Sequence, residues 1–244
     1  MIGYYGHPQR KLIDSCKREY GSELIDLDVD YNHKDAGLVP KVYCQIIRNI
    51  INNALFYKNK ISLIIASVGE EKCDAGRFAG FILKDLGFNV IESRIIDNME
   101  SRETVISESG LPLKEKILRI MDMVHTEANR DVSSCEPVMG FWGVPPSDLS
   151  ILELFPDKTH VFGWTRCVEA GRPADINLEM YAFENLPTVF FAQSFCQKSS
   201  LARYLSEKYN GLYVDADRYA SESTKAKIKA FIKLRVENGD LCRG

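Results

Sequence analysis

Short apolar runs alternate with longer amphipathic stretches along the chain. Residues 61–67 (ISLIIAS) are continuously apolar apart from their serines, as is typical of a strand buried on both faces of a parallel sheet. Residues 39–57 carry apolar side chains on one helical stripe, and Pro40 suits the first turn of such a helix. The same reading predicts further strands at 2–5, 23–29, 88–91, 138–143, 159–163, 188–193 and 212–214, and further helices at 12–20, 73–86, 113–127, 147–155, 197–209 and 224–234. Strands that alternate with helices predict an α/β fold with parallel sheets covered on both faces.

A polar segment without hydrophobic periodicity, residues 128–136 (ANRDVSSCE), separates two such runs of strands and helices. We therefore predict two Rossmann-like α/β lobes, an N-terminal lobe over residues 1–130 and a C-terminal lobe over residues 131–244. Two lobes of this kind suggest a cleft between them.

Charge and hydropathy exclude several classes of protein. The 244 residues include 31 Lys and Arg against 34 Asp and Glu, so the net charge of −3 favours neither nucleic acid nor a membrane surface. The N-terminus lacks an apolar run of signal-peptide type, and no apolar stretch has the length of a membrane span. We expect a cytoplasmic protein without a nucleic-acid or membrane partner. In that compartment, its seven cysteines are expected to be thiols or metal ligands rather than disulfides.

Four cysteines follow predicted strands, at the carboxyl edge where open α/β sheets bind ligands. Cys44 and Cys73 lie in helix starts after the strands at 23–29 and 61–67, Cys167 follows 159–163, and Cys196 follows 188–193. Helix N-termini favour a thiolate, and several thiolates in one cleft would suit zinc or an iron–sulfur cluster. Cys16 and Cys242 lie away from this edge, and Cys135 lies in the polar segment.

A structural role is the alternative for each of these cysteines. A cysteine outside a disulfide usually packs as a small buried hydrophobe. The chain has no Cys-x-x-Cys pair, and its four histidines form no metal-spaced pair. It also lacks the glycine-rich dinucleotide fingerprint, the Walker loop, the nucleophile elbow and the His-Glu-x-x-His motif, which argues against the corresponding enzyme classes.

The stretches around these cysteines resemble a known family. VPKVYCQIIRNIINNAL and ISLIIASVGEEKCDAGRFAGFIL are similar to the first-lobe pattern of the 2-hydroxyacyl-CoA dehydratase and benzoyl-CoA reductase superfamily. VFFAQSFCQKSSLARYL and GLYVDADRYASESTKAKIKAFI resemble the family's last ligand cysteine, the strand that follows and the closing helix. The chain looks like a short, divergent, D-component-like member.

This resemblance implies a [4Fe–4S] cluster whose three protein ligands fall on Cys44, Cys73 and Cys196, with Cys167 as a possible fourth or nearby thiol. It further implies a lyase- or reductase-type subunit that receives low-potential electrons from an ATP-dependent activator protein, and a homo- or heterodimer. The alternatives are a non-redox protein that binds a small ligand in the same cleft and a cofactor-maturation enzyme with a catalytic cysteine.

Two further segments could contact a substrate. GFWGVPPSD contains Trp142 between two glycines, where a ligand could approach the backbone, although a plain strand-to-helix turn fits as well. GWTRCVEAGRPAD contains Arg166 and Arg172, which could bind a phosphate or carboxylate. A solvated loop with internal ion pairs is the alternative there.

Overall fold

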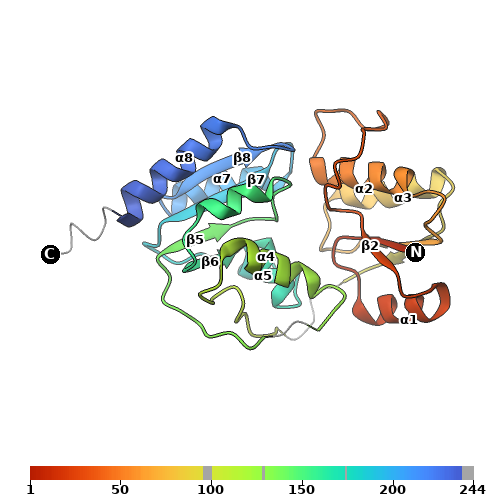
Figure 1. Cartoon of the computed structure of the whole chain (residues 1–244), viewed down its shortest axis with the longest axis horizontal. Helices are drawn as coiled ribbons and strands as arrows, with labels where there is room; N and C mark the ends of the chain where they lie inside the picture. The colour runs from red at the N-terminus through yellow and green to blue at the C-terminus, as the bar shows by residue number, and fades with distance from the viewer. Residues whose placement is uncertain (96–100, 128–129, 174, 238–244) are drawn as a thin grey trace. The chain divides into compact units, whose positions relative to one another are not determined.

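The computed structural model describes residues 1–95, 101–127, 130–173 and 175–237. The chain divides into two compact units, Met1–Met99 and Glu100–Gly244, and each unit contains its own four-stranded parallel sheet (Figure 1). Among the described residues, no helix combines the length and the apolar character that crossing a membrane requires.

The N-terminal unit is a sheet of strand order β2-β1-β3-β4 with helices on its faces. Its strands are β1 (Ile2–Tyr5), β2 (Leu24–Asp26), β3 (Leu63–Ser67) and β4 (Val90–Ser93), and its helices are α1 (Arg10–Tyr20), α2 (Gln45–Phe56) and α3 (Asp74–Asp85). Helices α2 and α3 contact each other, and Figure 1 shows them together on one side of the unit with α1 on the other. Every residue of β3 is buried, as its continuous apolar run predicts.

The C-terminal unit repeats this order as β6-β5-β7-β8. Its strands are β5 (Met139–Trp142), β6 (Thr159–Phe162), β7 (Thr188–Gln193) and β8 (Leu212–Ala216), and its helices are α4 (Leu113–Asp122), the 3₁₀ helix η1 (Leu149–Leu154), α5 (Trp164–Glu169), α6 (Ile176–Glu179), α7 (Lys198–Lys208), α8 (Glu222–Ile232) and the π-helix η2 (Lys233–Glu237). The prediction of an α/β fold with two Rossmann-like lobes is confirmed. In each unit the strand order reverses direction once, between β1 and β3 in the first and between β5 and β7 in the second. Open α/β sheets bind ligands at such switch points.

The boundary between the units lies at residues 99–100, about thirty residues before the predicted position at 130. The segment that precedes α4 packs on the C-terminal unit, where the Arg102 backbone N–H donates to Ala170 O at 2.9 Å. Helix α4 is fixed by Lys116, whose buried ammonium donates to Thr159 O at 2.6 Å. Residues 130–136 of the polar segment therefore lie within the C-terminal unit.

Two local predictions also differ from the structure. Helix α2 begins at Gln45, because Cys44 has the non-helical angles φ −51° and ψ 127°, so Pro40 lies outside the helix. The predicted binding loop at 163–175 contains the short helix α5. Asp175 caps the next helix, α6, by accepting the Leu178 N–H at 2.9 Å, which fits a side-chain oxygen at an N-cap.

Candidate functional site

Two of the predicted ligand cysteines lie at matching places in the N-terminal unit. Cys44 is the N-cap of α2, which follows β2, and Cys73 is the N-cap of α3, which follows β3. These two strands lie on either side of β1. Cys73 is exposed, whereas Cys44 is half-buried and packs against the apolar core of the unit.

Lys72 directly precedes Cys73 and is largely buried. Its ammonium is 3.6 Å from Asp28 Oδ2, and its side chain is only 11% exposed. Burial alone would lower the pKa of Lys72, but the negative charges of Asp28, Cys73, Asp26 and Cys44 outweigh this effect and raise it.

The carboxylates around this ammonium come from the end of β2. Asp28 Oδ2 accepts the Gly6 backbone N–H at 2.6 Å, directly after β1, and Asp26 Oδ1 accepts the Asp28 N–H at 2.9 Å. Burial and the charge of Asp28 both raise the pKa of Asp26. Strands β1, β2 and β3 thus converge on one polar cluster at the switch point.

Part of the hydrogen-bonding capacity of this cluster is unused within the described structure. Asp28 Oδ1 and Ser67 Oγ are both buried and have no hydrogen-bond partner there. Ser67, the last residue of β3, is completely buried. Buried polar atoms are normally satisfied, so water or a ligand group is expected to complete these two.

The equivalent edge of the C-terminal unit contains Cys196. It follows β7 as Cys73 follows β3, and it is half-buried. The Cys196 N–H donates to Gln193 O at 3.0 Å, closing a turn in which Phe195 has the positive φ of 62°. This angle is unusual for a bulky side chain, and such strain is often found at functional sites. The Phe195 ring is nevertheless 57% exposed.

Cys167 occupies the matching place after β6, but it has the environment of a packing residue. It is completely buried within α5, and burial strongly raises its thiol pKa. A thiol that stays protonated is a poor metal ligand. The environment of Cys167 therefore argues against its role as a cluster ligand.

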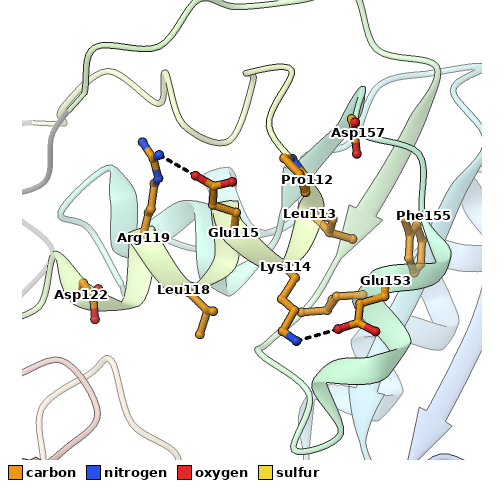
Figure 2. A pocket seen from close by; sticks show the side chains of 11 residues that line it. Pro112, Leu113, Lys114, Glu115, Leu118, Arg119, Asp122, Glu153, Phe155 and Asp157 are labelled. Carbon is orange, nitrogen blue, oxygen red and sulfur yellow. Dashed lines mark hydrogen bonds and ion pairs between the residues drawn. The ribbon is translucent and has the colours of Figure 1, made fainter.

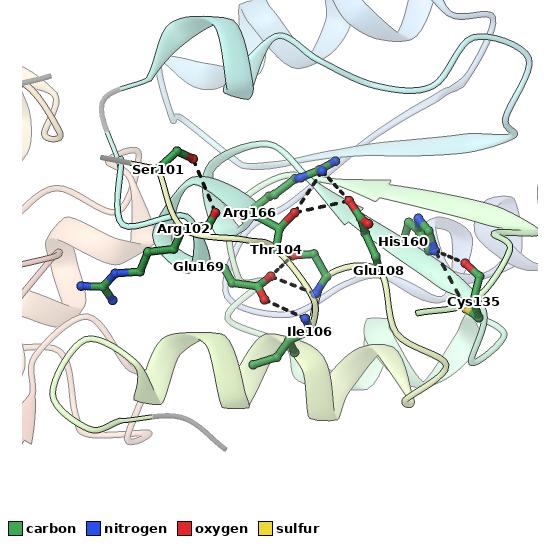
Figure 3. Close-up of polar contacts among 10 residues, drawn as sticks. Ser101, Arg102, Thr104, Ile106, Glu108, Cys135, His160, Arg166 and Glu169 are labelled. Atoms are coloured by element: carbon green, nitrogen blue, oxygen red, sulfur yellow. Dashed lines mark hydrogen bonds and ion pairs between the residues drawn. The ribbon is translucent and has the colours of Figure 1, made fainter. Parts of the chain in front are cut away.

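The three predicted substrate residues make internal contacts. Trp142 is 1% exposed and its indole N–H donates to Glu179 O at 2.6 Å. Arg166 pairs with Glu108 Oε1 at 2.5 Å, as Figure 3 shows, and Arg172 pairs with Asp175 Oδ2 at 3.0 Å. The two arginine contacts match the alternative of internal ion pairs, and a contact of any of the three residues with substrate stays a prediction.

The remaining cysteines lie elsewhere. Cys16 is buried in α1. Cys135 Sγ lies 3.9 Å from His160 Nε2, which is also 2.8 Å from the Cys135 carbonyl oxygen (Figure 3). Cys242 lies outside the described residues.

A shallow pocket of about 470 Å³ lies on the C-terminal unit, over α4 and η1. Figure 2 shows the ion pairs Lys114–Glu153 and Arg119–Glu115 at its wall. None of the predicted ligand cysteines lines it.

Lys72 was not among the predicted site residues. The only local signal was the position of Lys72 directly before Cys73. Among the described residues, no three His, Cys, Asp or Glu side chains are grouped to hold a metal ion. Comparison with protein-family models and with curated proteins gives no match for this chain.

Proposed function

We propose that this chain is an iron–sulfur redox protein in which Cys44, Cys73 and Cys196 bind a [4Fe–4S] cluster. In the proposed role, the cluster accepts low-potential electrons from an ATP-dependent activator and transfers them to a substrate or partner. When bound, the cluster would supply one-electron chemistry, and the protein would supply burial and hydrogen bonds to its sulfurs.

The observation that carries this proposal is that Cys44 and Cys73 occupy the N-cap positions of two helices of one unit, each after a strand next to β1. Cysteine sulfur is the usual ligand of iron–sulfur clusters. Cys196 has the equivalent position after the third strand of its own unit, and it is accessible enough to act as a ligand. All three residues carry thiols, the donor type that holds iron–sulfur clusters.

Anaerobic purification with iron and sulfide analysis tests the proposal. We expect a brown protein with about four iron and four sulfide per chain. Cys44→Ser, Cys73→Ser and Cys196→Ser should each lose most of the iron. The electron paramagnetic resonance signal of the dithionite-reduced cluster should disappear with it.

Cys135→Ser is the matched control, because Cys135 is also half-buried but lies away from both carboxyl edges. It should keep the iron content of the unmodified protein. A colourless, iron-free protein after anaerobic reconstitution would refute the proposal. That result would favour a non-redox ligand-binding or cofactor-maturation protein.

A further inference from the structure

Two connecting segments lie along the outer edge of the C-terminal sheet. Strand β6 ends the order β6-β5-β7-β8, so β5 pairs with only one of its two edges. An inner segment, residues 106–109, lies at the other edge, where the Val161 N–H donates to Ser107 O at 3.0 Å. An outer segment, residues 132–135, lies against the inner one. Covering an edge strand in this way keeps it from pairing with other chains.

His160 of β6 connects the outer segment to the sheet. The outer segment pairs with the inner one through a bridge between Ser109 and Ser134, and the Cys135 N–H donates to Glu108 O at 2.9 Å. The Cys135 carbonyl oxygen lies 2.8 Å from His160 Nε2 (Figure 3). A carbonyl oxygen only accepts hydrogen bonds, so Nε2 carries a proton and donates it. Both backbone groups of Cys135 are therefore held.

The surroundings of the His160 ring favour its neutral form. The residue is 4% exposed, and the Phe183 ring lies 6.1 Å from it. Its second nitrogen, Nδ1, is buried and has no hydrogen-bond partner within the described structure. Because Nε2 is already protonated, a second proton would go to Nδ1 and would place an unpaired donor and a positive charge in the interior. Burial accordingly lowers the pKa of His160 below its usual value.

The charged groups around the ring do not offset this burial. Lys116 of α4 donates to the carbonyl directly before His160 at 2.6 Å, and Arg166 of α5 also disfavours a second positive charge. Glu108 would favour it, but this carboxylate lies 2.5 Å from Arg166 Nη2 and is largely neutralised there. The Cys135 thiol lies 3.9 Å from Nε2, on the side that is already protonated. Two cations thus oppose one carboxylate that is already paired.

We propose that His160 is a pH-sensitive latch, whose neutral ring holds residues 132–135 at the edge of the sheet and whose protonation in mild acid releases them. In the released state the ring is in water and takes up a proton near its usual pKa of about 6.5. The released state therefore binds more protons than the closed state. The closed state is fully favoured above about pH 6.5 and loses stability as the pH falls below that value.

Hydrogen exchange of the full chain tests this proposal, measured about one pH unit above and about one below the usual histidine pKa of about 6.5. Mass spectrometry with fragmentation to single residues gives a protection factor for each amide, once the intrinsic exchange rate at each pH is divided out. The protection factor of the Cys135 amide should fall about threefold or more in acid. The Gly140 amide, which donates to Pro187 O at 2.9 Å inside the same sheet, is the internal reference and should keep its protection factor.

His160→Gln keeps a donor for the Cys135 carbonyl oxygen and carries no charge at either pH, so it should remove the pH dependence. His33→Gln is the matched control, because His33 is half-buried and its Nε2 lies 3.3 Å from Tyr57 Oη. It should keep the pH dependence of the unmodified protein. Equal Cys135 protection at both pH values in the unmodified protein would overturn the proposal, and so would a fall that persists in His160→Gln.

A second measurement on the unmodified protein decides if His160→Gln does not fold. The titration of the His160 Cε1–H, followed by nuclear magnetic resonance, should have its midpoint below about 6.5. A midpoint at or above that value would overturn the proposal, because the closed state would then not disfavour the proton.

Discussion

Glu169 forms hydrogen bonds to the segment before α4. Its substitution should therefore strongly lower the free energy of unfolding. Its completely buried carboxylate accepts the Ile106 N–H at 2.7 Å, the Ser107 N–H at 2.9 Å and the Ser107 hydroxyl at 2.5 Å (Figure 3). Glu169→Gln keeps the shape of the side chain but places an NH₂ group against at least one of these donors. Hydrogen bonds to a charged group are about 1 kcal/mol stronger than neutral ones, and an unsatisfied buried donor costs about 1–3 kcal/mol.

Part of this loss is offset, because burial raises the pKa of Glu169 and so penalises its charged form. We therefore expect Glu169→Gln to lower the free energy of unfolding by about 2–4 kcal/mol, a large share of the roughly 5–15 kcal/mol of a typical protein. Urea denaturation followed by circular dichroism measures this difference. Glu207→Gln on the exposed face of α7 is the control and should stay within about 0.5 kcal/mol of the unmodified protein. If the two variants unfold at the same urea concentration, Glu169 does not carry the role we assign to it.

Two further predictions concern the backbone at Phe195 and the charge of Lys116. Phe195→Gly relieves a positive φ, so it should leave the free energy of unfolding unchanged or raise it by up to about 1 kcal/mol. Phe78→Gly in α3 should instead lower the free energy of unfolding by about 1 kcal/mol or more. The two variants are a matched pair, because the two rings are 57% and 58% exposed. Comparison of their thermal midpoints checks this, and similar losses in both would contradict it. Burial lowers the pKa of Lys116 in the folded state to about 8. The pKa of a lysine in the unfolded state is about 10.4, so between these two pH values the unfolded state binds more protons than the folded state. The free energy of unfolding should therefore rise as the pH increases from about 8 to about 10.4. Lys116→Met should reduce this rise in urea titrations at the two ends of the range, and an unchanged pH dependence would refute the assignment.

Local sequence patterns predicted most of the sheet but not its edges. The apolar runs at β3 and β7 correctly predicted buried strands. A strand covered on both faces has apolar side chains at nearly every position, so it is easily recognised in the sequence. The alternation in residues 23–29 predicted a longer β2, which ends at Asp26 because the Asp26 carboxylate accepts the Asp28 N–H in a turn. Hydrogen bonds of this kind, from a side chain to the backbone, compete with the hydrogen bonds of the strand. The pattern of hydrophobic residues does not reveal them.

The candidate site could likewise be predicted only in part from the sequence. The positions of Cys44, Cys73 and Cys196 after strands follow from element order, which the sequence reveals. The burial of Lys72 depends on Gly6 and Asp28, which follow two other strands. No local pattern links residues that meet only when three strands are paired. The complete burial of Cys167 has the same origin.

Within the part of the chain that the structure describes, each sheet is built from one uninterrupted segment, and no strand is exchanged between the two units. Parallel pairing over long sequence separations is slow, and an unfinished sheet exposes open edges. On the ribosome, the first unit has all four of its strands before the second unit has any. At roughly 5–20 residues per second, Cys196 is synthesised about 5–20 seconds after the end of the N-terminal unit. With the proposed ligands, Cys44 and Cys73 would wait for their third thiol throughout that interval, so cluster insertion would be a late step of biogenesis.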